Sequence, residues 1–342
     1  MEKEETISID STSGGNGDIW MRLVSFYAIS LLKPEFKFQI KIPVFIADLA
    51  TYTFGDRLTI ISDNTECDYT FTSLGIKHMI KDILKGRKFI SPYARSVIKD
   101  KKKKEFKDLI NLVLYNLMDN LGYIQVPEEK WIEVYQGYLD IIGLKKIRSV
   151  SYESYVNQLN QDYPILFKKL NSVGLPTSPE LTIPADLNEN IVVFPTGTSR
   201  QFIPVWWAKE NIPDAYFAFF FKDKEAAVFI KNGLKVVYFY KEAGDIIALS
   251  KAAKRTLSTD SFPSHLLQYA TSNCVITITE VLKSRIIAPV YKGQVVDNRV
   301  ACHPCLHIVK TLNCAAGYKE CLNWKNIHYT QDLINKLKSN YA

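Results

Sequence analysis

The chain has 342 residues, which is enough for two domains of about 150 residues each. Hydrophobic residues make up 47% and charged residues 23%, an ordinary composition for a globular protein. The longest apolar runs, "AYFAFFF" and "LINLVLYNL", are too short to span a membrane, and the acidic, polar start lacks a secretory signal. We therefore expect a cytoplasmic protein, and its formal net charge of +7 favours an anionic partner such as a nucleotide, a nucleic acid or an acidic lipid surface.

Strands and helices alternate in the N-terminal region. Residues 6–10 alternate like a short strand, and 17–33 carry apolar residues at helical spacing. Further strands are predicted over 36–43 and 56–63, with a helix over 44–52 between them. Strands that alternate with helices in this way favour a parallel sheet covered on both faces.

The middle of the chain has a different pattern. Residues 76–170 are predicted to be largely helical and irregular, and the clearest amphipathic helix covers 105–123. The lysine-rich run 98–107 is interpreted as a solvated helix start or loop, with a phosphate-facing patch as the alternative. Three prolines and few periodic apolar positions over 170–190 predict an interdomain linker.

A second alternation of strands and helices follows the linker. The predicted strands are 190–195, 214–221, 235–240, 255–260 and 274–280, and the predicted helices are 205–212, 225–233, 245–253 and 263–271. Two α/β halves joined by a linker therefore make up the predicted architecture. Because ligands of such sheets bind at the carboxyl ends of the strands, two facing sheets would enclose a cleft between the domains.

The glycine-rich turn "DSTSGGNGDIW" joins the first predicted strand to the first helix. Gly15 and Gly17 let the backbone turn tightly and approach a bound group closely. The turn is not the dinucleotide fingerprint, because Trp20 holds the place of the third glycine, and no Gly-Lys-Ser/Thr of a P-loop follows. Asp18 at the helix start is either a cap and dipole partner or a carboxylate that acts as a base.

Two loops at predicted strand ends carry groups suited to a nucleotide. The first offers hydroxyls and a guanidinium that match phosphate oxygens, on Thr198, Ser199 and Arg200. The second carries Lys222 and Glu225, and the carboxylate at this edge is suited to accept hydrogen bonds from ribose hydroxyls. An ordinary capped loop and a solvated helix start are the alternative interpretations of these two segments.

The stretch "LSTDSFPSHLLQYA" is predicted to be a strand, a sharp turn and a helix. Asp260 and Ser261 suit the cap of that helix, and Pro263 suits its first turn. The unpaired N–H groups at the helix start are a ready site for a diphosphate, and His265 can donate to the same oxygens. The alternative is a capped helix with an ordinary histidine in its first turn.

Four of the six cysteines crowd into one C-terminal segment with the spacing Cys-x2-Cys-x8-Cys-x6-Cys. They are Cys302, Cys305, Cys314 and Cys321. Four cysteines this close in a cytoplasmic chain point to a structural metal such as zinc, with His303 and His307 as competing ligands. Two disulfides or four packed thiols are the alternatives.

Taken together, these stretches resemble glycosyltransferase family 9, the ADP-heptose:lipopolysaccharide heptosyltransferases and their relatives. The resemblance rests on the glycine turn with "GD", on "PTGTSR", on "DSFPSHL" and on the C-terminal cysteine pattern. It implies an α/β GT-B fold, in which two Rossmann-like domains with doubly wound parallel sheets face each other across a cleft. We expect an acceptor-side domain over 1–172 and a nucleotide-sugar-binding domain over 185–325, with a C-terminal helix over 326–342 that packs on the N-terminal domain.

The resemblance also implies roles for individual residues. The family's catalytic aspartate falls on Asp18, and its nucleoside-side acid falls on Glu225. The family's diphosphate-binding turn falls on Asp260, Ser261 and His265.

Two features depart from the family's pattern. Phe262 stands where the family has a glycine, next to the backbone that phosphate would approach. Gln201 and Phe202 occupy the region where the family has a lysine. The candidates that could supply the missing positive charge are Arg200, Lys222 and Lys224.

The function that we expect is inverting, metal-independent glycosyl transfer from a nucleotide-diphosphate sugar. Asp18 would deprotonate an acceptor hydroxyl, and the helix end at 261–265 together with Arg200 would stabilise the leaving diphosphate. No Asp-x-Asp metal clamp occurs in the sequence, so no catalytic cofactor is expected. The acceptor implied by the resemblance is a saccharide or a lipid-linked saccharide, with peripheral contact at the inner membrane face. A glycosyltransferase of phage type that acts on nucleic-acid bases, and a non-catalytic nucleotide-sugar-binding protein, are the alternatives.

Overall fold

The computed structural model describes residues 6–12, 15–32, 34, 37–61, 69–71, 88–90, 163–195, 202–221, 223–239, 241–278, 283–288, 290–297 and 322–339. The chain divides into two compact units, the first over 1–164 and the second over 165–342, and each is described by itself. The predicted helix over 105–123 and the lysine-rich run 98–107 lie outside the described residues.

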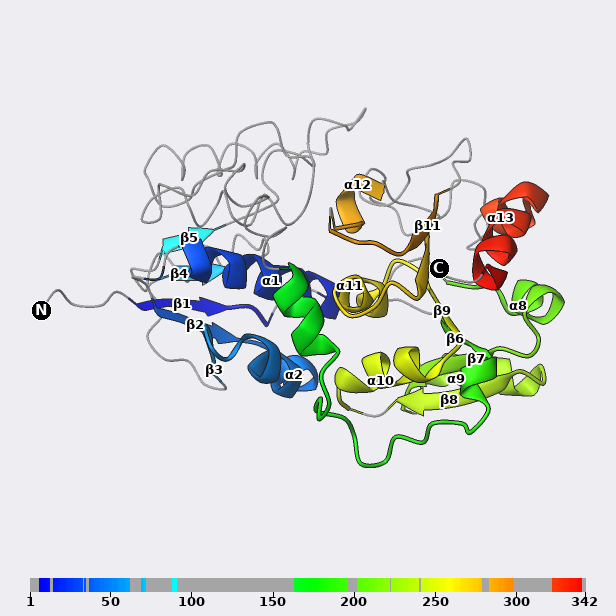
Figure 1. Cartoon of the computed structure of the whole chain (residues 1–342), viewed down its shortest axis with the longest axis horizontal. Helices are drawn as coiled ribbons and strands as arrows, with labels where there is room; N and C mark the ends of the chain where they lie inside the picture. The colour runs from blue at the N-terminus through cyan, green and yellow to red at the C-terminus, as the bar shows by residue number, and fades with distance from the viewer. Residues whose placement is uncertain are drawn as a thin grey trace, which may run out of the picture. The chain divides into compact units, whose positions relative to one another are not determined.

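The first unit holds a parallel sheet built from alternating strands and helices (Figure 1). Its elements are β1 (Thr6–Asp10), α1 (Asn16–Leu32), β2 (Lys37–Lys41), α2 (Val44–Phe54) and β3 (Leu58–Ile61). These strands pair in parallel in the order β1-β2-β3, which confirms the predicted sheet. A second parallel pair, β4 (Tyr69–Phe71) and β5 (Lys88–Ile90), lies next to β1. β1 pairs with β2 and also contacts β4, which is the arrangement expected of a topological switch point.

The helices of the first unit are held by aromatic packing. Trp20 of α1 and Phe54 at the end of α2 have ring centroids 5.3 Å apart, and Tyr27 lies at the same distance from Phe54. All three rings are buried, as are Leu23 and Phe26 at the helical spacing that the sequence shows. This packing fixes α1, and with it Gly17 and Asp18 in its first turn.

The second unit contains a sheet of six parallel strands. They are β6 (Ile191–Phe194), β7 (Tyr216–Phe220), β8 (Lys235–Phe239), β9 (Arg255–Ser258), β10 (Cys274–Ile278) and β11 (Gln294–Asp297). Their order is β11-β10-β9-β6-β7-β8, so the first strand of the unit lies between the second and the fourth. That is the strand order of a doubly wound dinucleotide-binding sheet, with its switch point between β6 and β9.

Helices cover both faces of this second sheet. They are α8 (Val205–Asn211), α9 (Lys224–Lys231), α10 (Gly244–Ala252), α11 (Phe262–Leu267), α12 (Lys283–Ile286) and α13 (Ile327–Lys338), with the 3-10 turns η1 (Leu187–Glu189) and η2 (Leu322–Lys325). Figure 1 shows α10 and α11 on the opposite side of the sheet from α8 and α13. Every strand and helix predicted after residue 190 is present, whereas β11 and α12 were not predicted. Within the described part of the chain, no helix is long and apolar enough to cross a membrane.

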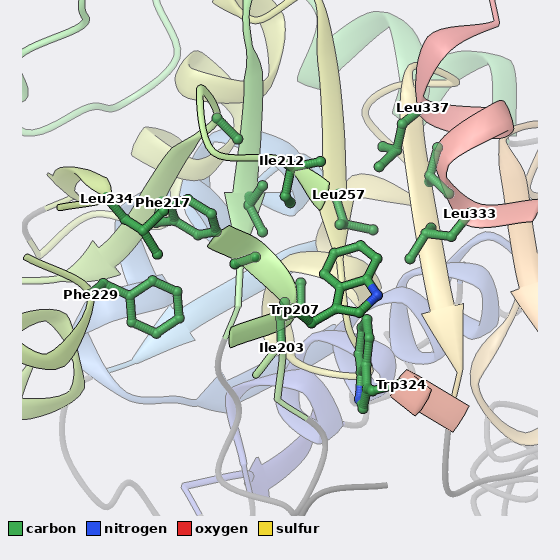
Figure 2. Packing of buried hydrophobic residues seen from close by; sticks show 14 of the residues in the cluster. Ile203, Trp207, Ile212, Phe217, Phe229, Leu234, Leu257, Trp324, Leu333 and Leu337 are labelled. Atoms are coloured by element: carbon green, nitrogen blue, oxygen red, sulfur yellow. The ribbon is translucent and has the colours of Figure 1, made fainter. Parts of the chain in front are cut away.

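The main core of the second unit lies on the face covered by α8, α9 and α13 (Figure 2). Phe217 and Phe219 of β7 point to this face and contact Phe229 of α9, with ring centroids 5.0 Å apart in both pairs. Trp207 of α8 meets Trp324 edge to face, with centroids 4.9 Å apart. Burial of these large rings stabilises the sheet.

The C-terminal helix α13 packs within the second unit. Tyr329, Leu333 and Leu337 recur every four residues and form its buried stripe. The helix lies against β9, β10 and β11, and the buried Arg255 guanidinium donates to the carbonyl of Lys336 at 3.0 Å. The second sheet thus buries the amphipathic stripe of this helix, and the predicted contact with the N-terminal domain stays a prediction.

The proline-rich segment predicted to be a linker is attached to the second unit along much of its length. The backbone N–H of Ser178 donates to the buried carboxylate of Asp245 at 2.7 Å. The Tyr216 hydroxyl donates to Asp186 at 2.6 Å, which lowers the pKa of that carboxyl group. The helical residues 165–170 also belong to this unit.

Substitution of Gly244 is expected to detach this segment. A Cβ atom at that position would lie 1.7 Å from the carbonyl oxygen of Pro176, which is backbone and cannot rotate away. Gly244→Ala should therefore lower the free energy of unfolding by about 1–3 kcal/mol, measured by urea denaturation. Lys251→Ala on the exposed face of the same helix is the control and should change it little. Equal stability of Gly244→Ala and the wild type would show that the close approach does not exist.

Candidate functional site

The candidate site lies at the switch point of the second sheet. β6 and β9 are parallel neighbours, and Phe194 pairs in register with Ser258 at their carboxyl ends. The segments that follow these two residues therefore leave the sheet from adjacent points on one edge. β7 is the parallel neighbour of β6 on its other side, so its carboxyl end belongs to the same edge. Ligands of doubly wound sheets bind outside this edge, at the switch point.

The segment after β6 contains three predicted phosphate-binding residues. Thr198, Ser199 and Arg200 lie outside the described residues, so their roles stay predictions. The carbonyl of Pro195 accepts a hydrogen bond from the N–H of Ile203 at 2.9 Å. This bond joins the start and the end of the intervening segment at the carboxyl end of β6.

The turn after β9 is fixed by serine hydroxyls. Ser261 is the N-cap residue of α11, and its N–H donates to the hydroxyl of Ser264 at 3.3 Å. The Ser264 hydroxyl donates in turn to the Ser261 carbonyl at 2.8 Å. The helix has six residues, and Pro263 contributes no N–H, so this helix end has fewer donors for an anion than the sequence suggested. Much of the binding of an anion here must then come from side chains.

His265 and Asp260 form a buried pair beside this turn. Nε2 of His265 lies 3.2 Å from Oδ1 of Asp260, and the two side chains are only 8% and 10% exposed. Nδ1 of His265 is buried without a hydrogen-bond partner among the described residues. A buried nitrogen without a partner costs free energy, and a ligand that pairs with it would recover that cost. Asp260 and Ser261 were both predicted to suit the cap of α11; Ser261 is its N-cap residue, and the carboxylate of Asp260 lies against this imidazole.

The segment after β7 turns directly into α9. The N–H of Asp223 donates to the carbonyl of Phe220 at 2.9 Å, and the Asp223 carboxylate accepts from the N–H of Glu225 at 3.0 Å. Asp223 therefore caps α9, and Glu225 stands exposed in the first turn. Lys222 lies outside the described residues. This places a carboxylate at the same sheet edge as the pair of Asp260 and His265.

In the first unit, the predicted base lies in the first turn of α1, after β1. Oδ2 of Asp18 accepts a hydrogen bond from the N–H of Gly15 at 3.1 Å, so the carboxylate also stabilises the glycine turn. Its other oxygen has no hydrogen-bond partner within the described ranges. Gly17 is buried, whereas a Cβ atom on Gly15 would meet only this carboxylate, at an ordinary 3.7 Å. The fold itself therefore does not require a glycine at position 15.

Arg22 is a functional candidate that the sequence reading missed. Its side chain is buried, and a guanidinium nitrogen donates to the hydroxyl of Ser11 at 2.8 Å, just beyond the end of β1. The backbone of Ser11 also extends the pairing of β1 with β2, through a bond to the carbonyl of Lys41. The sequence feature that could have indicated Arg22 is its charge among the apolar residues of α1, one helical turn after Asp18.

The predicted cysteine cluster lies outside the described residues. Cys302, Cys305, Cys314 and Cys321 therefore remain a predicted zinc site. In the ranges that the structure describes, no group of His, Cys, Asp and Glu side chains could hold a metal ion. Cys274 in β10 is buried, and this burial raises the pKa of its thiol to about 12, so it is inert near neutral pH.

No model of a known protein family matches this sequence, and no curated protein matches it either. Solved structures do match it. ADP-heptose LPS heptosyltransferase II of E. coli aligns with a TM-score of 0.55 and 12% identity over 97% of both chains. A glycosyl transferase family 9 protein of Veillonella parvula aligns with a TM-score of 0.54 and 11% identity over 99% of both chains. The chain therefore has the α/β GT-B fold of the family 9 heptosyltransferases, as its motifs predicted.

Proposed function

We propose that this protein is a glycosyltransferase that moves a sugar from a nucleotide-diphosphate sugar to an acceptor hydroxyl. The observation that carries the proposal is the strand order of the second sheet. It brings the carboxyl ends of β9, β6 and β7 to one edge beside the switch point, and each of the three segments predicted to bind a donor follows one of these strands in the sequence. The fold shared with a heptosyltransferase supports the same assignment.

On the donor side, His265 is the proposed ligand of the diphosphate. Asp260 accepts from Nε2 and holds the imidazole, which leaves Nδ1 to pair with a phosphate oxygen when the ring is protonated. A carboxylate would repel phosphate directly, so we assign Asp260 to orienting His265 rather than to contacting the donor. Arg200 and the hydroxyls of Thr198 and Ser199 complete the phosphate site.

On the acceptor side, Asp18 is the proposed general base. The N–H of Gly15 holds Oδ2, and Oδ1 takes the proton from the acceptor hydroxyl. The acceptor oxygen then bonds to the anomeric carbon as the bond from that carbon to the diphosphate oxygen breaks. Attack opposite the leaving group inverts the anomeric centre. The reaction requires the two switch points to face a common cleft, and closure of that cleft would exclude water.

No catalytic metal is part of this proposal. The leaving diphosphate is stabilised instead by Arg200, by His265 and by the start of α11, in a preorganised positive field. Structural zinc at the four C-terminal cysteines would be separate from the chemistry.

The comparison and the net charge support candidates for the donor and the acceptor. The E. coli structure is named for ADP-heptose and LPS, so an ADP-activated sugar and a lipid-linked saccharide at the membrane face are the first candidates. The net charge of +7 favours nucleic-acid bases as the second candidate acceptor. Phe262, which begins α11 where the family has a glycine, is the feature that favours a non-catalytic nucleotide-sugar-binding protein.

The proposal is tested by binding and turnover together. Purified protein is screened against nucleotide sugars by thermal shift, and each ligand that raises Tm is assayed for release of its nucleoside diphosphate in the presence of acceptors. A rise in Tm with turnover supports the transferase, and a rise without turnover supports the non-catalytic alternative. The absence of any Tm rise across ADP-, UDP-, GDP-, CDP- and dTDP-sugars would contradict the proposed function.

Removal of the imidazole should weaken donor binding. His265→Ala is expected to raise the Kd of the selected nucleotide sugar by about 10- to 100-fold, because a hydrogen bond to a charged group is lost. Isothermal titration calorimetry measures this change. His328→Ala, on an exposed histidine at the start of α13, is the matched control. An unchanged Kd in His265→Ala would remove this residue from the donor site.

A further inference from the structure

Three phenylalanine rings gather at the carboxyl ends of β6, β7 and β8. Phe220 and Phe239 are the last residues of their strands and pair in register. Their ring centroids lie 5.6 Å apart at an interplanar angle of 72°, and Phe239 meets Phe194 at 6.0 Å and 65°. Edge-to-face contacts of this kind fix the rings relative to one another.

The three rings differ in exposure. Phe194 and Phe239 are 1% and 8% exposed, whereas Phe220 is 42% exposed. Alternation along β7 explains the direction of the ring, since Phe219 points to the main core on α9 and Phe220 points to the opposite face. A single exposed ring is common on protein surfaces, so the exposure of Phe220 alone does not indicate a binding role. Its position at the sheet edge is the relevant observation.

That position is where the nucleoside of a bound nucleotide would lie. In doubly wound sheets, the diphosphate sits at the switch point, and an acid after the second strand binds the ribose. Here the second strand is β7, and the acid that follows it is Glu225 in the first turn of α9. The turn from Phe220 to Asp223 places the start of α9 directly after the strand that carries the ring. The nucleobase should therefore lie beyond Glu225, on the side that faces away from His265.

We propose that Phe220 is the stacking platform for the base of the nucleotide-diphosphate donor, and that Phe239 holds it in place from behind. This inference rests on the proposed function and extends it to a residue that no motif marks. Every nucleobase has an aromatic face, so the ring contributes affinity for any base, and choice among bases falls to other groups.

The experiment compares a nucleotide with the same ligand lacking its base. The probe is the nucleoside diphosphate that binds the wild type tightest among ADP, UDP, GDP, CDP and dTDP, and its partner is ribose 5-diphosphate. By calorimetry, Phe220→Ala should raise the Kd of the nucleotide by roughly 5- to 150-fold, the range expected for loss of one base–aromatic stack. The Kd of ribose 5-diphosphate should not change, and Phe220→Trp should retain nucleotide affinity. Ile230→Ala, an exposed apolar residue of α9, is the control and should bind as the wild type does.

The possible results of this experiment distinguish failure of the stacking role from failure of the proposed function. If Phe220→Ala binds the nucleotide as tightly as the wild type, the stacking role is overturned while the donor site stands. If Phe220→Ala loses nucleotide and ribose 5-diphosphate affinity equally, the ring supports only the shape of the sheet edge, and the stacking role is again overturned. If the wild type binds none of the five nucleotides, the proposed function fails first, and the inference fails with it.

Discussion

Replacement of Asp18 by asparagine should lower kcat for sugar transfer by about 10²- to 10⁴-fold, the range that a general base contributes. An asparagine side chain has the same shape, and its oxygen can still accept from the N–H of Gly15, so the turn at the start of α1 is kept. It cannot take a proton from the acceptor hydroxyl. The Kd of the donor should stay nearly unchanged, because the donor is assigned to the other unit.

The measurement is a pair of assays on the same preparation, with nucleoside diphosphate release for kcat and calorimetry for donor Kd. Asp48→Asn, on an exposed aspartate of α2 in the same unit, is the control and should leave both values unchanged. Full activity of Asp18→Asn would refute the assigned base. A loss of donor binding equal to the loss of kcat would assign Asp18 to the donor instead.

Truncation of Trp207 should have the largest effect on stability. Its indole is 1% exposed, meets Trp324 edge to face, and donates from Nε1 to the hydroxyl of Thr330 at 2.9 Å. Trp207→Ala removes these contacts and leaves a cavity between α8 and α13, at an expected cost of about 3–5 kcal/mol. Because α8 follows the segment 196–202, the donor site should loosen as well.

Urea unfolding followed by circular dichroism measures this change, with Lys209→Ala on the exposed side of α8 as the control. The control should stay within about 0.5 kcal/mol of the wild type. A loss below about 1 kcal/mol for Trp207→Ala would show that α8 and α13 do not meet as the structure has them.

The elements of both sheets could be predicted because each carries a strong local signal. The apolar spacing of α1 and the continuous apolar run of β7 depend only on neighbouring residues. β11 was missed because its four residues follow a glycine and contain too few apolar positions to show a pattern. The C-terminal helix was predicted near its true bounds, but its contact with the second sheet was not predicted, since an amphipathic stripe does not say which core buries it.

The site could be predicted only in part, because its geometry depends on strand pairing. The alternation of strands and helices does not show that β6 lies between β7 and β9, and this order is what brings His265 and Glu225 to one edge. The register between paired strands cannot be predicted from neighbouring residues either, so no local sequence signal indicated that Phe220 pairs with Phe239. The contact of His265 with Asp260 arises where the turn meets α11, and a capped helix start alone did not reveal it.

The most direct test of the account is a crystal structure of the protein with a bound nucleoside diphosphate. The account predicts the diphosphate at the carboxyl ends of β6 and β9 within hydrogen-bond distance of His265, the ribose near Glu225 and the base against Phe220. A nucleotide bound at any other place on the molecule, with this sheet edge empty, would contradict it.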